Sequence, residues 1–296
     1  RTSSSAASDV YKRQDKDTKI QVEENPDEDI VRIDMEGTQR FALRPNRINW
    51  NTINGNVMIG QNSGQSLTTG YNNTGLGQLA MVDNTSGREN TGLGAYALTN
   101  NTTGERNTGL GTGALESNTT ASQNTAVGYY ALRNAQTNGA NTAVGNEALE
   151  AVISGGNNVA MGLQAFTSLL VGNDNVGIGN NTFHNSDTAW YNIAVGWRAG
   201  YNVDYGERNV LMGYLAGAGN ASHDKSYNVM IGHQAGHFNE GNANVFLGYQ
   251  AGMQESGNNK LYIENSNSTS PLIYGEFNND LVRINGTLDI NDAYQF

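Results

Sequence analysis

Residues 90–115 read NTGLGAYALTNNTTGERNTGLGTGAL and contain two copies of one five-residue pattern. The pattern is Asn, a β-branched residue, any residue, an aliphatic residue and Gly. From residue 56 to residue 209 its copies follow one another in nine steps of 17 residues, and the last two steps are 19 and 16 residues long. Such a fixed period predicts a stacked repeat architecture. The twelve copies begin at Asn 56, 73, 90, 107, 124, 141, 158, 175, 192, 209, 228 and 244.

The pattern predicts a short strand that ends in a tight turn. The second and fourth residues of an extended segment point to the same side. They are β-branched and aliphatic, so we expect this side to face the interior. The third residue is usually Gly or Ala, which allows another backbone to approach, and the invariant Gly suits a turn. The fourth residues are therefore expected to form one buried column, made of Ile59, Leu76, Leu93, Leu110, Val127, Val144, Met161, Ile178, Val195, Met212, Ile231 and Leu247.

We predict an all-β fold, a parallel β-roll or β-solenoid of about twelve 17-residue coils. Coils of equal length stack at about 4.8 Å, so twelve of them would form a rod roughly 58 Å long. Stacking places the invariant Asn residues above one another, where their amides would form a hydrogen-bonded ladder. Glu116, Arg133 and Glu150 occupy one column in successive coils, so their charges should alternate along the rod.

The composition excludes several classes of function. The net charge of −11 argues against nucleic-acid binding, which needs a basic surface. The chain has no Cys, which removes disulfides, thiolate metal sites and Cys nucleophiles. No apolar run of about 18 residues is present, so we expect no membrane insertion. We expect no cofactor and no bound metal.

Four regions follow from the change in composition along the chain. Residues 1–14, RTSSSAASDVYKRQ, resemble adaptor sequence or a Ser-rich tail. Residues 15–55 are expected to form a linker and an N-terminal β cap, and residues 56–252 the repeat domain. Residues 253–296 contain four expected strands, at 260–265, 271–277, 281–285 and 287–291, and lead into a downstream domain that we expect in a longer protein. Caps are expected because bare sheet edges promote aggregation.

The segments NTGLGAYAL, NTAVGYYAL and NVFLGYQAG resemble the head repeats of trimeric autotransporter adhesins, the YadA-like family, and of bacteriophage tail fibres. The resemblance covers about two thirds of the chain and implies a left-handed β-roll in which three chains lie side by side. The usual repeat of that family is shorter than 17 residues, so turn lengths differ here. A homotrimer also follows from the apolar columns at positions four and nine. A narrow coil has room for one of them, and the other would be exposed as an interface; in a wider roll both would point inward.

Aromatic residues gather in two or three neighbouring coils and are the candidate receptor-binding residues. The sixth column, Trp197, Tyr214, His233 and Tyr249, should face outward after the Gly turn. Exposed aromatic rings stack on sugars and anchor protein interfaces, although they could equally cover the roll or the trimer contact. The candidate residues are Trp190, Tyr191, Trp197, Tyr201 and Tyr214.

Other candidate sites are weaker. Glu116 and Glu150 would lie about 9.6 Å apart, two coils from one another, but Arg133 between them should keep both carboxylates ionised, which is unsuitable for a general acid. His223, His233 and His237 could bind a metal or simply lie on a polar surface. Five stacked Thr residues could bind ice, but they share the side of the aliphatic residues and are expected to point inward; they are Thr74, Thr91, Thr108, Thr125 and Thr142.

These observations predict an adhesive or structural role. We expect a segment of an extracellular fibre, on a bacterial cell surface or a virion tail, that presents a receptor-binding surface to a glycan or protein of a host or another cell. We expect no enzymatic activity. The alternatives are a tailspike that cleaves surface polysaccharide and a monomeric ice-binding solenoid.

Overall fold

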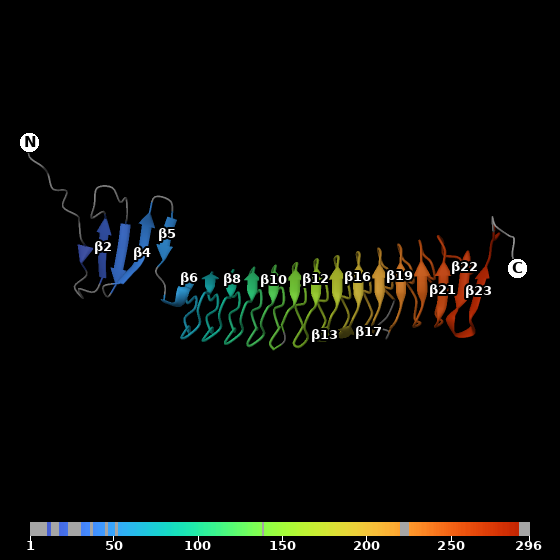
Figure 1. Ribbon diagram of the computed structural model, residues 1–296, viewed down its shortest axis with the longest axis horizontal. Coiled ribbons are helices and arrows are strands. Elements are labelled where there is room, and N and C mark those ends of the chain that lie inside the picture. Colours follow the sequence, from blue (N-terminus) through green and yellow to red (C-terminus); the bar gives the residue numbers. More distant parts are fainter. Residues whose placement is uncertain are drawn as a thin grey trace, which may run out of the picture.

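The described part of the chain is all-β and forms a rod of stacked coils (Figure 1). The computed structural model describes residues 11–12, 18–22, 31–35, 38–44, 47–50 and 53–289, apart from 138 and 220–224. Its only helices in these ranges are two short 3-10 turns, η1 (Ile53–Gly55) and η2 (Phe277–Asn279). Neither is long enough to cross a bilayer.

One strand from each repeat enters a single sheet that runs the length of the rod. Neighbouring strands are parallel and in register, as shown by the pairs Thr125 with Thr142 and Val127 with Val144. The register survives both unequal steps, since Val210 pairs with Val229 and Val229 with Val245. These strands are β6 (Val57–Ile59), β7 (Thr74–Leu76), β8 (Thr91–Leu93), β9 (Thr108–Leu110), β10 (Thr125–Val127), β11 (Thr142–Val144), β12 (Val159–Met161), β14 (Val176–Ile178), β16 (Ile193–Val195), β18 (Val210–Met212), β19 (Val229–Ile231) and β20 (Val245–Leu247).

Three further groups of strands accompany this sheet. A small parallel sheet contains β13 (Val171–Asn173), β15 (Thr188–Trp190) and β17 (Tyr205–Glu207). The long sheet continues into β21 (Lys260–Ile263), which is parallel, and then into β22 (Ile273–Glu276) and β23 (Leu281–Ile284), which are antiparallel. A separate antiparallel sheet precedes the coils and contains β1 (Tyr11–Lys12), β2 (Thr18–Val22), β3 (Val31–Met35), β4 (Thr38–Arg44) and β5 (Arg47–Trp50).

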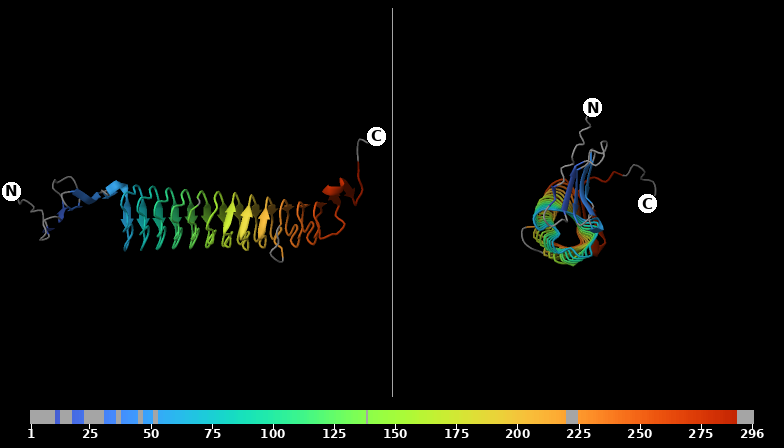
Figure 2. Two further views of the ribbon diagram at one scale, coloured as in Figure 1. Left: turned by 90° about the horizontal axis from the view of Figure 1, so that it is seen from below. Right: turned by 90° about the vertical axis from the view of Figure 1, so that its left-hand side faces the viewer.

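The predicted parallel coils, from residue 56 to residue 252, are confirmed, and in end view they lie over one another (Figure 2). Three of the four strands expected after residue 252 are present. The fourth is wrong for residues 287–289, which form no strand, and its remainder lies outside the described residues. The domain boundaries, the caps, the handedness and the trimer stay predictions.

The expected orientation of the strands is wrong, because the structure reverses their two sides. The third residue faces inward and is buried in every strand from β7 to β20. The second and fourth residues face outward, and Leu76 is 47% exposed. The interior instead contains the apolar residues of position nine, such as Leu98 and Leu115, which are fully buried. The coil is narrow, so one large apolar column fills it, and the small third residues leave room for that column.

Positions three and nine face each other across the interior, and a large side chain at one position usually accompanies a small one at the other. Where position nine is large, position three is Gly or Ala: a Cβ on Gly177 would lie 2.5 Å from Phe166 Cε2. Where position nine is Gly, position three is usually large: a Cβ on Gly236 would lie 2.3 Å from Met230 Sδ, and one on Gly252 would lie 2.6 Å from Phe246 Cδ1. In the coil of Asn192 both positions are small, and there Phe183 and Leu211 of the neighbouring coils fill the space beside Gly200, as close packing requires.

The predicted Asn ladder is present and ties every coil to its neighbours. Direct amide-to-amide bonds, such as Asn175 Nδ2 to Asn158 Oδ1 at 2.9 Å, occur in part of the rod, whereas bonds from a backbone N–H to the Asn Oδ1 atom of the preceding coil occur throughout. Asn107 Nδ2 donates to the carbonyl of Ala121 at 2.8 Å, within its own coil. The Asn107 Oδ1 atom accepts the backbone N–H of Asn124 at 3.0 Å, in the next coil. The Asn107 N–H in turn donates to Asn90 Oδ1 at 2.9 Å. Except at Asn124, whose Nδ2 atom has no hydrogen-bond partner, each amide therefore closes its own coil and stacks the following one, and all twelve are buried.

We predict that Leu115→Ala destabilises its coil far more than Leu110→Ala in the same coil. Leu115 is fully buried and Leu110 is half-buried on the outward side. Truncating a buried Leu costs about 2–5 kcal/mol of unfolding free energy. Native-state hydrogen exchange of residues 107–123 measures both effects, because a long repeat array need not unfold in one step. Equal protection in the two variants would contradict the assignment of the interior.

Asn107→Ala should also destabilise the rod, with Asn100→Ala as the matched control. The first variant leaves the Asn124 N–H buried without its partner, at about 1–3 kcal/mol, and leaves the Ala121 carbonyl with Asn118 Nδ2 as its remaining side-chain donor. Asn100 lies ten residues after Asn90, the buried Asn that begins its coil. It is half-buried and makes no side-chain hydrogen bond in the structure. Hydrogen exchange of the Asn124 amide reports the loss directly, and an unchanged rate would show that the ladder contributes little.

Candidate functional site: the strand face and the aromatic column

The outward sides of the repeat strands form one continuous surface, which we call the strand face. It consists of the second and fourth residues of the twelve strands from β6 to β20 that belong to the long sheet. None of these residues is buried, and Ile178, for example, is 40% exposed. Monomeric proteins rarely leave a long apolar surface open to water, so the strand face is the main candidate for an interface.

The strand face changes character along the rod. In β7 to β11 the second residue is Thr and the fourth is Leu or Val. In β12, β14, β16, β18, β19 and β20 the second residue is Val or Ile, and the fourth is aliphatic. The first group therefore displays a ladder of hydroxyl groups beside aliphatic side chains, and the second displays aliphatic side chains alone. The expectation that the five Thr residues point inward is wrong.

An exposed aromatic column runs along one edge of the strand face, as predicted. Trp197 stacks on Tyr214 and Tyr214 on His233, each with ring centroids 4.8 Å apart. His233 stacks on Tyr249 at 5.3 Å. This spacing is close to the distance of about 4.8 Å between neighbouring strands of a sheet, because each ring follows the Gly that ends its strand. The inner rings cover one another's faces, so they offer their edges, N–H and O–H groups to a ligand.

Trp197, Tyr201 and Tyr214 are brought together. The Arg198 guanidinium lies 4.4 Å from the ring centre of Trp197 and 4.7 Å from that of Tyr201. Tyr201 also stacks on His184, with ring centroids 5.1 Å apart. A cation thus links the aromatic column to a second ring pair on the same side of the coils.

The other two candidate residues lie apart from this group. Tyr191 immediately precedes the buried Asn192, so it flanks the opposite edge of the strand face, where it is exposed. The Arg208 guanidinium lies 5.3 Å from its ring centre. Trp190 belongs to β15 of the small sheet and is half-buried. The five residues therefore do not form one cluster.

The edge near Tyr191 carries a network that the sequence analysis missed. Arg208 Nη1 donates to the Tyr227 hydroxyl at 3.0 Å, and that hydroxyl donates to Glu207 Oε1 at 2.8 Å. Arg208 is also paired with Glu207, at 2.6 Å. Tyr227 lies beyond the 19-residue step, so equal spacing alone would not align it. Alignment on the invariant Asn places it in the column of Tyr191 and Arg208.

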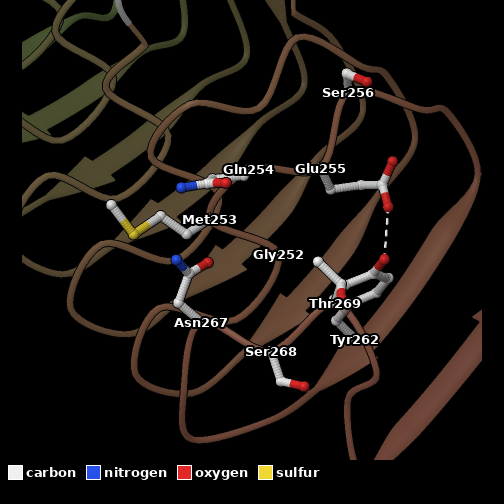
Figure 3. Close-up of a pocket in the computed structure, with 9 residues that line it drawn as sticks. All are labelled: Gly252, Met253, Gln254, Glu255, Ser256, Tyr262, Asn267, Ser268 and Thr269. Atoms are coloured by element: carbon white, nitrogen blue, oxygen red, sulfur yellow. Dashed lines mark hydrogen bonds between the residues drawn. The ribbon is translucent and has the colours of Figure 1, made fainter.

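A small pocket of about 160 Å³ lies where the repeats end (Figure 3). The Tyr262 hydroxyl donates to Glu255 Oε2 at 2.6 Å, and the Gly257 N–H donates to Glu255 Oε1 at 2.7 Å. Burial, and next the Glu255 carboxylate, raise the pKa of Tyr262, which keeps its proton. The pocket was not foreseen, because it lies beyond the periodic columns. Its lining residues are Gly252, Met253, Gln254, Glu255, Ser256, Tyr262, Asn267, Ser268 and Thr269.

The acidic column is present, but its electrostatics differ from expectation. Arg133 Nε lies 2.7 Å from Glu116 Oε2, and Arg133 Nη1 lies 3.7 Å from Glu150 Oε1. The pKa of Glu150 is nevertheless raised, by burial first and by Glu147 second, because these effects exceed that of Arg133. Arg133 itself lowers the pKa of Glu150, as predicted, but burial and Glu147 outweigh it.

The histidines do not converge. His233 lies in the aromatic column, and His237 stacks on Phe238 with ring centroids 4.1 Å apart. His223 lies outside the described residues. Within the part of the chain that the structure describes, no group of three or more His, Cys, Asp or Glu residues could hold a metal ion.

Comparisons of the chain with protein-family models, with curated proteins and with solved structures find no match.

Proposed function

We propose that this chain is a structural and adhesive segment of an extracellular fibre, on a bacterial surface or a virion tail, in which three copies associate through their strand faces. The observation that carries this proposal is the continuous outward surface from β6 to β20, in which the fourth residue of every repeat is aliphatic and none of these residues is buried. The resemblance of the repeats to YadA-like head repeats and tail-fibre repeats supports the same assembly.

The dimensions of the strand face suit an interface. Three residues at about 3.3 Å give a width of about 10 Å, and twelve strands give a length of roughly 58 Å. The strand face thus covers roughly 600 Å² per copy, before its flanking columns are counted, compared with about 800 Å² per partner in a stable complex. The strand faces of two copies can pack with their residues in register, because the spacing between coils is the same in both copies.

Association would repeat the aromatic column around the fibre axis. The ring edges of Trp197, Tyr214 and Tyr249 remain accessible beside the strand face in a single copy, where these residues are exposed. Three weak contacts on one rigid rod would bind a surface far more tightly than a single contact. The ligand class we propose is a glycan or protein of a host or another cell.

A second candidate function, ice binding, is favoured by one observation. The Thr ladder of β7 to β11 faces outward from a regular sheet, whereas an inward ladder would have excluded contact with ice. This function needs the strand face open to water, and self-association would cover it. The two candidates therefore predict different oligomeric states.

We predict that Ile178→Asp prevents association and leaves the coil folded. Ile178 is exposed in the middle of the strand face, so the charge would be buried only on assembly, at a cost of several kcal/mol. Ile153→Asp is the matched control, because Ile153 is also exposed (47%) but lies outside the strand face. Sedimentation equilibrium should show a trimer for the unmodified chain and the control, and a monomer for Ile178→Asp, with equal circular dichroism.

A chain that remains monomeric at high concentration would contradict the assembly. If such a monomer also changes the shape of growing ice crystals, and Thr108→Leu abolishes that change, the second candidate function replaces the first.

We further predict that Trp197→Ala weakens adhesion without dissociating the trimer. The substitution removes the first ring of the column and the platform of Arg198. Binding to glycan arrays and whole cells should fall at least tenfold per fibre, since avidity multiplies the loss across three copies. Tyr96→Ala, at an exposed Tyr with no stacked ring in the structure, is the control. Equal binding by both variants would assign the column to packing alone.

A further inference from the structure

Among the described residues, three coils of the rod carry a second sheet on another wall of the coil. Its strands β13, β15 and β17 are parallel and in register, since Thr188 pairs with Val171 on one side and with Tyr205 on the other. This small sheet shares no strand with the long sheet. Figure 1 draws β13 and β17 along the lower edge of the rod, whereas the strands of the long sheet run along its upper edge. Association through the strand faces therefore leaves the small sheet open to water.

Two aromatic residues, Trp190 and Tyr205, lie on the outward side of the small sheet. Thr188 pairs with Tyr205 and Trp190 pairs with Glu207, so the two aromatic residues are diagonal neighbours on adjacent strands. The middle residue of each strand is buried, whereas Tyr205 is 51% exposed and Trp190 is half-buried. Diagonal neighbours on one side of a sheet are close enough for a single ligand to contact both side chains.

The repeat itself does not require a ring at the position of Tyr205. This is the fourteenth position of its coil, and in the earlier coils it is Ser, Thr or Val. Those coils close and stack in the same way without an aromatic side chain there, so Tyr205 is not needed to cover the interior. The earlier residues at this position are Thr69, Ser86, Thr103, Thr120, Thr137, Ser154, Val171 and Thr188.

The rings of Trp190 and Tyr205 differ from the neighbouring aromatic rings in having no partner. Within the part of the chain that the structure describes, neither ring stacks on another ring or on a cation, and neither the indole N–H nor the Tyr205 hydroxyl makes a hydrogen bond. By contrast, the Arg208 guanidinium lies 5.3 and 5.5 Å from the ring centres of Tyr191 and Tyr227. A ring with an open face and a free donor suits the apolar face and the hydroxyl groups of a sugar.

Carboxylates border the two rings at both ends of the small sheet. Asp187 and Asp204 immediately precede β15 and β17, and the Asp187 N–H donates to Asp204 Oδ1 at 3.3 Å. At the other end of the sheet, Glu207 lies 2.6 Å from the Arg208 guanidinium, so this cation is already paired. The surface around the rings is therefore acidic. It repels sialylated or sulfated sugars and offers acceptors to the hydroxyl groups of uncharged ones.

We propose that the small sheet binds an uncharged glycan, with Trp190 and Tyr205 stacked on its sugar rings and Asp187 and Asp204 accepting hydrogen bonds from its hydroxyl groups. Three strands at about 4.8 Å and three residues at about 3.3 Å give a surface of about 14 Å by 10 Å, which suits a short oligosaccharide. The role of this site as a receptor contact rests on the proposed adhesive function, which it deepens by naming the ligand class. Binding itself requires neither the strand face nor the trimer.

Isothermal titration of the full chain with soluble hexasaccharides tests this site. The uncharged probes are cellohexaose, maltohexaose, mannohexaose and chitohexaose, and a heparin hexasaccharide is the acidic probe. At least one uncharged probe should bind, and the heparin probe should bind about tenfold more weakly or not at all. Trp190→Ala and Tyr205→Ala should each weaken binding about tenfold, whereas Trp190→Phe, which keeps a ring, should retain most of it. Tyr96→Ala, at an exposed Tyr several coils before the small sheet, should bind like the unmodified chain.

Circular dichroism establishes that each variant is folded, and adhesion to whole cells is measured in parallel. A chain that adheres to cells but binds none of the uncharged probes overturns the site and leaves the proposed function intact. Binding that persists in both Trp190→Ala and Tyr205→Ala also overturns the site, as does tighter binding of the heparin probe. Binding that depends on Trp190 in a chain that does not adhere to cells supports the site and contradicts the proposed function.

Discussion

One buried amide in each coil determines the rest of the structure. The Asn before each strand accepts a backbone N–H of the next coil and, except at Asn124, donates to a carbonyl of its own coil, so it sets both the closure and the rise of the rod. The in-register sheet follows from this constraint, because every strand starts at the same height on the same column. The aromatic column follows as well, since stacked coils place rings of the same position above one another, as Trp197 and Tyr214 are at 4.8 Å.

The sequence was sufficient to predict the architecture but not which side of each strand faces inward. The period, the Asn ladder, the charged column of Arg133 and the outward aromatic column all come from spacing, and the structure contains each of them. Alternation along a strand defines two sides but does not determine which side faces the interior. Apolar residues at positions two and four favour the wrong side here. The sizes of the side chains indicate the interior side. A large residue at position three accompanies Gly at position nine, as in Leu211 with Gly217 and Phe246 with Gly252, because positions three and nine face each other across the interior.

The candidate site was predictable to a similar extent. Counting residues from each Asn predicted the column of Trp197 and Tyr214, and the same count separates Tyr191 and Trp190 from it. The pocket beside Tyr262 was not predictable in this way, because it lies beyond the periodic part of the chain.

The tolerance of the long sheet for unequal steps has a consequence for how such a rod can change in length. Steps of 19 and 16 residues leave β18, β19 and β20 in register, so extra or missing residues are absorbed outside the strands. Duplicating or deleting one whole coil therefore changes the reach of the rod by about 4.8 Å and leaves both of its ends intact. Recombination between similar coils can therefore change the length of the rod in small, equal steps. Such a change does not alter the residues at the ends of the rod.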